Sequence, residues 1–380
     1  MRTAPALMAV VSVATALTLG ACASSGSSSG PSGAAEQNAT CSVTLPSAPS
    51  PPSFPSASGS TPKAAPVTGT VGVIVPKEAP GMVPGHRDIA LLKQSLRAAG
   101  LVPVVRAARA GGPGFVAISR SMVGAGVRVL IIGTGDRAAG IRAEHVAELA
   151  GVDVIEYGGV TIGGSAEYAV SPDYEQIGRL QAQTMIRCLT ARGLTRPKII
   201  LVDGGTNVDE NAVLLDLGAH RVLDPLVSSG GAQLVEETSV SGWHTDRAAA
   251  AFTLALDTAE GSVDGVVAAS DAIASQVIGV LGRRGLDTTQ VAGQGLGVEG
   301  LWNIATGRQS LTVTTDLERE ADAATQLARA LVTGDRRALA ALSLSRFDDP
   351  TAPSRDLRTL MVPGQAVTGA TAGQVVRTPD

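Results

Sequence analysis

The strongest constraint on the fold is the alternation of short apolar runs with segments of helical period. Residues 70–75, 127–132 and 153–157 are apolar and rich in β-branched side chains, and the segment 87–99 between the first two places Ile89, Leu92 and Leu96 on one helical face. Successive strands joined by helices run parallel, and near-continuous apolar strands indicate a sheet covered on both faces. This pattern predicts one doubly wound α/β lobe.

The same rhythm begins again after Tyr168. Strand-like runs recur at residues 198–202, 233–237 and 265–269, and helical segments at 211–223 and 245–258 separate them. Because no linker divides the two series, we expect an α/β fold of two Rossmann-like doubly wound lobes that share a cleft.

Polar and glycine-rich loops follow several of the predicted strands, among them Gly133-Thr-Gly-Asp136, Tyr157-Gly-Gly159 and Asp203–Asp209. In doubly wound sheets a ligand lies beyond the carboxyl ends of the strands. We therefore expect the ligand site among these loops.

The N-terminus predicts export. Arg2 precedes a nearly apolar stretch at residues 5–21, which is short of the roughly 20 residues that span a bilayer. The ending Leu19-Gly20-Ala21-Cys22 resembles a bacterial lipoprotein signal, in which the Cys thiol is lipidated; an ordinary cleaved signal is the alternative. We expect residues 1–22 to be a signal peptide, and Cys22 to anchor the protein on the extracytoplasmic face of the cell membrane.

Residues 23–66 are dominated by Ser, Gly, Pro, Ala and Thr and hold few side chains that could pack. Such a segment cannot offset its ordering entropy, so we expect a disordered tether. Cys41 lies in it, and Cys188 lies in a helix-like apolar run. We favour a buried, inert thiol for Cys188 over a disulfide with Cys41.

Composition excludes several functions. The formal net charge is −4, and nucleic-acid binding would need a basic face to neutralise phosphates. The sequence has no CxxC motif, no His/Cys cluster with metal-ligand spacing and no marked nucleophile beside the His244/Asp246 pair. We expect no metal, no cofactor and no enzyme activity.

Five stretches occur in the order found in one known family: Ile177–Gln183, Val208–Ala212, Gly265–Ala272, Val291–Gln294 and Ile304–Val313. The chain thereby resembles the periplasmic sugar-binding proteins, the type I solute receptors of ABC importers, and among them the D-xylose-binding proteins in particular. The resemblance implies two lobes joined by three crossovers, which close on a monosaccharide. It also implies a sugar-like solute and an ABC permease as partners, and a monomer.

With this fold we expect an N-terminal lobe of residues 67–169 and 316–345, and a C-terminal lobe of residues 172–314 and 346–380. The crossovers are expected near residues 169–171, 314–316 and 346–355.

The resemblance also implies a set of ligand-binding residues: Tyr157, Asp173, Asp209, Asn211, Trp243, Asp271 and Gln294. Carboxylates and amides can satisfy sugar hydroxyls, and a planar indole can cover the C–H face of a sugar ring. Four of these assignments have a structural alternative. Trp243 could be core, Asp173 and Asp271 could cap helices, and Asn211 could start one; Trp302 is expected in the core.

The chain departs from the family at several ligand positions, and Thr314-Thr315 stand where a Lys often follows the last crossover strand. Gly158 and Gly159 stand where an Asp-Arg pair is expected, and Gly295 stands where an Asp is expected. Loss of these charged groups predicts a ligand other than xylose, or weak xylose binding. A divergent envelope lipoprotein acting as sensor or scaffold is the alternative function.

Overall fold

The computed structural model describes Cys41 and residues 69–77, 87–109, 113–133, 136–206, 209–349 and 351–375. The predicted signal peptide, Cys22 and the predicted tether apart from Cys41 lie outside these residues. No helix within the described ranges is long and apolar enough to cross a membrane.

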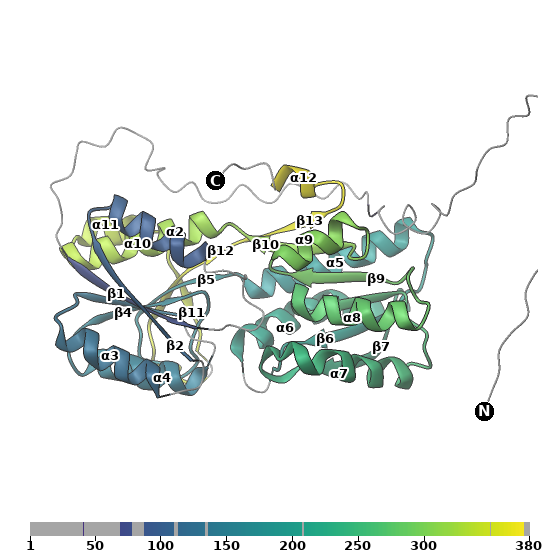
Figure 1. Cartoon of the computed structure of the whole chain (residues 1–380), viewed down its shortest axis with the longest axis horizontal. Helices are drawn as coiled ribbons and strands as arrows, with labels where there is room; N and C mark the ends of the chain where they lie inside the picture. Colours follow the sequence, from purple (N-terminus) through teal and green to yellow (C-terminus); the bar gives the residue numbers. More distant parts are fainter. Residues whose placement is uncertain are drawn as a thin grey trace, which may run out of the picture. The chain divides into compact units, whose positions relative to one another are not determined.

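The first sheet has seven strands in the order β11-β12-β5-β4-β3-β1-β2 (Figure 1). Its strands are β1 (Thr70–Pro76), β2 (Val102–Ala108), β3 (Val129–Ile132), β4 (Asp153–Tyr157), β5 (Tyr168–Pro172), β11 (Ser345–Phe347) and β12 (Leu357–Val362). All pairs are parallel except β11 with β12. One face is covered by α2 (Arg87–Ala98) and α10 (Leu317–Thr333), followed by α11 (Arg336–Ala341), and the other by α3 (Gly114–Gly124) and α4 (Arg137–Glu148).

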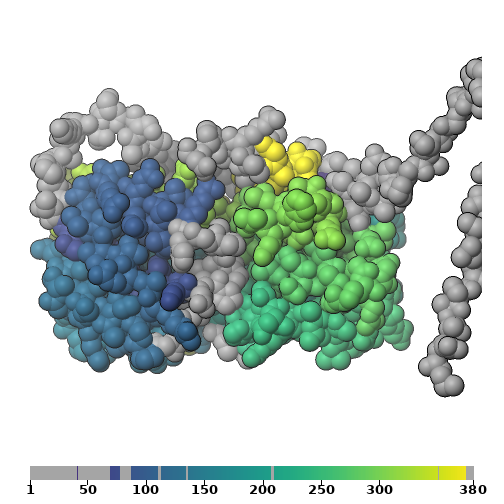
Figure 2. Space-filling model, viewed as in Figure 1, coloured from purple at the N-terminus to yellow at the C-terminus, as the bar shows by residue number. Residues whose placement is uncertain are grey.

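The second sheet has six strands in the order β13-β10-β9-β8-β6-β7, parallel except for the edge strand β13. These are β6 (Lys198–Asp203), β7 (Gln233–Ser239), β8 (Gly265–Ala268), β9 (Gln290–Gln294), β10 (Leu311–Thr315) and β13 (Gly364–Thr368). One face carries α5 (Tyr174–Ala191) and α6 (Glu210–Ser228). The other carries α7 (Thr245–Thr258), α8 (Asp271–Arg283) and α9 (Val298–Ala305), which form the green surface in Figure 2. The short elements are η1 (Ser241–Trp243) and α12 (Ala372–Val375).

Burial follows the sequence pattern. All residues of the central strands β3 and β8 are buried, as near-continuous apolar runs require. Pro103, which lacks an N–H, lies in the edge strand β2, where a missing ladder donor is tolerated. The predicted fold class, two doubly wound α/β lobes, is confirmed.

The chain passes between the sheets three times, and each passage occupies a single residue. Asp173 joins β5 to α5, Asp316 joins β10 to α10, and Pro363 joins β12 to β13. The first and third passages are bonded together, because the Asp173 N–H donates to Val362 O at 2.9 Å.

The expected boundaries of the lobes need one correction. Residues 346–380 were assigned to the second lobe, with a crossover at 346–355, but β11 and β12 belong to the first sheet. β12 pairs with β5 in parallel, and only β13 joins the second sheet. The strand 357–362 combines buried Leu and Val residues with Arg358 and Thr359, and this pattern fits either sheet, so it does not reveal which one the strand joins.

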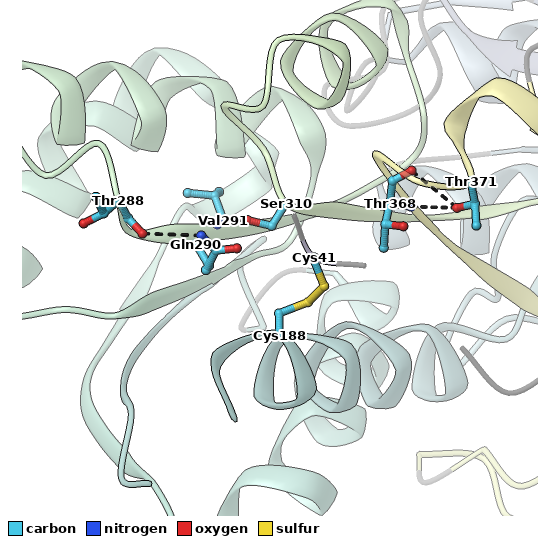
Figure 3. The surroundings of a disulfide bond; sticks show 8 residues. All are labelled: Cys41, Cys188, Thr288, Gln290, Val291, Ser310, Thr368 and Thr371. Atoms are coloured by element: carbon cyan, nitrogen blue, oxygen red, sulfur yellow. Dashed lines mark hydrogen bonds between the residues drawn. A yellow bond between two sulfur atoms is a disulfide. The ribbon is translucent and has the colours of Figure 1, made fainter. Parts of the chain in front are cut away.

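The expected state of the cysteines was also wrong. Cys41 and Cys188 form a disulfide, with their Cα atoms 5.1 Å apart, and both are buried in the core of the second lobe. Figure 3 shows the bond between α5 and the isolated Cys41, with Gln290, Val291 and Ser310 in its surroundings. The predicted tether is therefore fixed to this lobe at Cys41. A separation of 147 residues carries no local signal of this contact.

Candidate functional site

A pocket lies between the two lobes, and its space is about 380 Å³ when the open mouth is included. The first lobe contributes residues from the ends of β3 and β4 and from the start of α4. The second lobe contributes the start of α6. The described lining residues are Ile132, Asp136, Arg137, Tyr157, Gly159, Val160, Thr161, Ile162, Asp209, Glu210 and Asn211. The site thus lies beyond the carboxyl ends of parallel strands, as expected.

The second-lobe wall is fixed by the N-terminus of α6. Asp209 is its N-cap, and its Oδ1 accepts hydrogen bonds from the N–H groups of Asn211 at 2.8 Å and Ala212 at 3.2 Å. Burial raises the pKa of Asp209, while these two bonds and one from the Trp243 side chain oppose the rise. Capping therefore engages the Asp209 carboxylate and holds Asn211 at the pocket.

The first-lobe wall begins at Tyr157 and continues through the residues that follow β4. Gly159 packs directly against Asn211: a Cβ at Gly159 would lie 2.6 Å from Asn211 Nδ2. No side chain fits there without displacing Asn211.

An ion pair connects the two walls. Arg137, in the first turn of α4, donates through Nη2 to Glu210 Oε2 at 2.8 Å, and Glu210 lies in the first turn of α6. The pair was not predicted from the sequence. The signal was available, because Arg137 follows the cap Asp136 just as Glu210 follows the cap Asp209, and both caps begin helices at strand ends that face the cleft.

Three buried polar atoms of the lining residues have no hydrogen-bond partner in the described structure: Tyr157 Oη, Asn211 Oδ1 and Arg137 Nε. A buried polar group without a partner costs about 1–3 kcal/mol. The three atoms belong to residues that line the same pocket: one can donate and accept, one can only accept, and one can only donate.

Trp243 lies beside this group rather than in it. Its indole covers Gly204, at the end of β6, and donates to the Asp209 carboxylate. Trp243 is partly buried against the second-lobe core and is not among the described residues that line the pocket. Of the seven predicted residues, the structure brings Tyr157, Asp209 and Asn211 to the pocket and Trp243 behind Asp209.

The other three predicted residues lie elsewhere. Asp173 caps α5 by accepting from the Gln176 N–H at 2.9 Å. Asp271 is buried, with Oδ1 accepting from Gln309 and Thr312 and Oδ2 from the Leu296 N–H, so its carboxylate already has protein partners. Gln294 ends β9 outside the described lining.

Trp302 was expected in the core, but its side chain is 64% exposed on α9. The prediction for Trp302 was wrong, because its helix covers the sheet only through the opposite face, with Gly300, Asn303 and Ile304 buried. Within the described ranges, no group of three or more His, Cys, Asp or Glu side chains could hold a metal ion.

A buried carboxyl lies behind Tyr157. Glu320 of α10 is almost fully buried and accepts from the backbone of Gly158. Burial, together with the nearby Asp88, raises the pKa of Glu320 to about 8. Burial, together with the carboxyls of Glu320 and Asp88, raises the pKa of the Tyr157 hydroxyl well above its ordinary value. Glu320 is therefore protonated at neutral pH.

Two lobes, three crossovers and a pocket between them form the geometry of a hinged solute receptor. The model of the periplasmic binding protein domain matches residues 88–336, which is more than half of the chain. The chain belongs to this family. Membership agrees with the expectation of a binding protein rather than an enzyme.

Two individual relatives are also similar in sequence to the chain. The D-xylose-binding periplasmic protein of Haemophilus influenzae is 30% identical over 204 residues, which cover 53% of this chain and 59% of that protein. The protein of the same name from Escherichia coli is 29% identical over 215 residues, covering 56% and 63% respectively. The matched region thus spans about three fifths of each relative's length.

A solved structure extends the likeness of the fold. The carbohydrate transporter solute-binding protein of Chloroflexus aurantiacus, in complex with D-glucose, superposes with a TM-score of 0.70 at 20% identity. The superposition covers 82% of this chain and 95% of that one.

We predict that stability falls as pH rises, through Glu320. The folded state holds this proton up to about pH 8, whereas the carboxyl's ordinary pKa is 4.5. Its contribution is fully present below pH 4.5 and is lost as pH rises through about 8. Glu320→Gln removes this titration. The difference between the melting temperature of Glu320→Gln and that of the wild type should therefore increase from pH 5 to pH 9.

Glu318→Gln is the matched control, because Glu318 is exposed on the same helix. Its melting temperature should follow the wild-type pH dependence. Parallel curves for wild type and Glu320→Gln would show that Glu320 does not hold a proton in the folded state.

Proposed function

We propose that this chain is the extracytoplasmic receptor of an ABC importer, and that it binds a neutral monosaccharide or related polyol between its lobes. The observation that carries this proposal is the set of unpartnered atoms Tyr157 Oη, Asn211 Oδ1 and Arg137 Nε. A sugar hydroxyl donates and accepts hydrogen bonds, so adjacent hydroxyls complement all three atoms at once.

The charges at the pocket favour a neutral solute. Glu210 neutralises Arg137, the one cation among the described lining residues, and Asp136 and Asp209 add two more carboxylates to the wall. Both aspartates cap helices, where backbone N–H groups stabilise their charge. Among these described residues a sugar acid would meet an excess of negative charge and no free cation, so its binding is disfavoured.

The relatives support the class of solute. Two are named for D-xylose and one structure holds D-glucose. In this chain Asn211 fills the space above Gly159, so the sugar meets an amide at the position where the resemblance implies a charged side chain. We therefore propose a neutral sugar whose contacts differ from those of xylose in the family.

Two features support an extracytoplasmic protein anchored by a lipid. Disulfides such as Cys41–Cys188 persist in oxidising compartments outside the cytoplasm. The stretch Leu19–Cys22 offers a thiol for lipidation. Partners in this proposal are the solute, an ABC permease and the membrane, with the receptor itself a monomer. No observation on the described residues favours the sensor or scaffold alternative.

Replacing Cys22 by Ser should release the protein from the membrane fraction into the soluble fraction, because it removes the acylated thiol. Fractionation and intact mass of both forms provide the measurement. A wild-type protein without acyl mass would contradict the anchor.

The test of the binding site is Tyr157→Phe, which removes only the unpartnered hydroxyl. The melting temperature of the free protein should stay unchanged or rise, because no hydrogen bond of the described structure is lost. Affinity should fall by about 1–3 kcal/mol, or roughly 5- to 150-fold, since a ligand hydroxyl loses its partner. Calorimetry with neutral pentoses and hexoses, starting with D-xylose and D-glucose, measures this.

Tyr168→Phe is the matched control, because Tyr168 begins β5 outside the described pocket lining. It should bind like the wild type, and D-glucuronate should bind neither protein appreciably. If no neutral sugar binds the wild type, the proposed function is wrong.

A further inference from the structure

The first-lobe wall of the pocket is a loop, residues 158–166, that rests on a buried polar network. Gly159, Val160, Thr161 and Ile162 of this loop line the pocket, and the loop contains no helix or strand. Such a segment needs other partners to hold its backbone in one conformation. Its partners come from α4, from the end of β4 just before the loop, and from the distant segment between β11 and β12.

Four backbone N–H groups of the loop donate to three buried carboxylates. Thr161 N–H donates to Glu156 at 3.1 Å, and Gly163 N–H donates to Asp349 at 2.8 Å. The N–H groups of Ser165 and Ala166 both donate to Glu144, at 2.8 and 3.1 Å.

Arg355 connects these carboxylates to the loop carbonyls. Its guanidinium donates to Glu156 at 2.7 Å and to Asp349 at 3.2 Å. It also donates to Thr161 O at 2.7 Å and to Ala166 O at 3.0 Å. The Arg355 side chain is only 7% exposed, so solvent cannot replace these bonds.

We propose that Arg355 is a positioning residue for the ligand pocket. It fixes the conformation of the loop 158–166 from the side facing away from the pocket, through Glu144, Glu156 and Asp349. This inference rests on the proposed function. The family's expected charged pair at the pocket surface is absent here, at Gly158 and Gly159. In its place, a guanidinium from the segment before β12 acts behind the wall and does not contact the ligand.

The balance of charge makes the cluster depend on Arg355. Burial raises the pKa of Glu144. Burial and the neighbouring Glu144 carboxyl raise the pKa of Glu156 well above its ordinary value. The charge of Arg355 opposes both shifts. A lysine retains the charge but cannot reproduce the planar fork that contacts two carboxylates and two carbonyls together. The conservative change Arg355→Lys is therefore the informative variant.

Hydrogen exchange tests the wall without any ligand. In Arg355→Lys, the amides of Thr161, Gly163, Ser165 and Ala166 should exchange about tenfold faster or more, because local opening becomes easier. The amides of Asn211 and Ala212, on the second-lobe wall, should keep the wild-type rate because Asp209 still caps them.

Binding of the neutral sugar identified with the wild type tests the consequence. Affinity for the sugar in Arg355→Lys should fall by about tenfold, because the loop 158–166 is held less firmly in its binding conformation. Arg346→Lys is the matched control from the same segment, since Arg346 is exposed, and should change neither measurement. If Arg355→Lys does not fold, Asp349→Asn weakens the same network and should accelerate hydrogen exchange at the amides of Gly163 and Thr161.

Two outcomes would overturn the inference. Faster exchange to the same extent on both walls, with unchanged affinity of the folded protein, would make Arg355 a general stabilising residue only. Unchanged exchange at the four loop amides would show that it does not hold the wall. A wild type that binds no neutral sugar would instead refute the proposed function, while the exchange result would still decide whether Arg355 holds the wall.

Discussion

The structure depends on one constraint, the direction of its parallel strands. Because both sheets are doubly wound and the chain crosses between them at single residues, the carboxyl ends of the strands meet at the lobe boundary. Helices α4 and α6 must then start at this boundary, with their capping aspartates beside the pocket. The Arg137–Glu210 pair follows from that geometry, since each residue immediately follows a cap.

The pocket combines satisfied and unsatisfied polar groups in a consistent way. The capping carboxylates, the Arg355 guanidinium and the loop N–H groups of Thr161, Gly163, Ser165 and Ala166 have protein partners, which fixes the walls. Tyr157 Oη, Asn211 Oδ1 and Arg137 Nε have none in the described structure, and we propose that a ligand supplies them. A site of this kind would be organised before binding, so less of the binding free energy would be spent on ordering side chains.

The sequence predicted what local periodicity can encode. The strand at 153–157 and the helix at 245–258 have the expected bounds, because apolar spacing alone sets them. Contacts between distant segments were not predictable this way: the placement of β12 in the first sheet and the Cys41–Cys188 bond leave no local pattern. Of the residues that the family likeness implied, Tyr157, Asp209 and Asn211 line the pocket. It did not reveal that Asp271 is engaged by Gln309 and Thr312, because sequence type does not show which partners a carboxylate already has.

The most direct test of the central claim is a crystal structure of the folded body with a neutral monosaccharide. The account predicts the sugar between the lobes, with hydroxyls in hydrogen-bond contact with Tyr157 Oη, Asn211 Oδ1 and Arg137 Nε, and with the Arg137–Glu210 pair intact. A sugar bound elsewhere, for example over Trp302, or one that leaves these three atoms without partners, would contradict it.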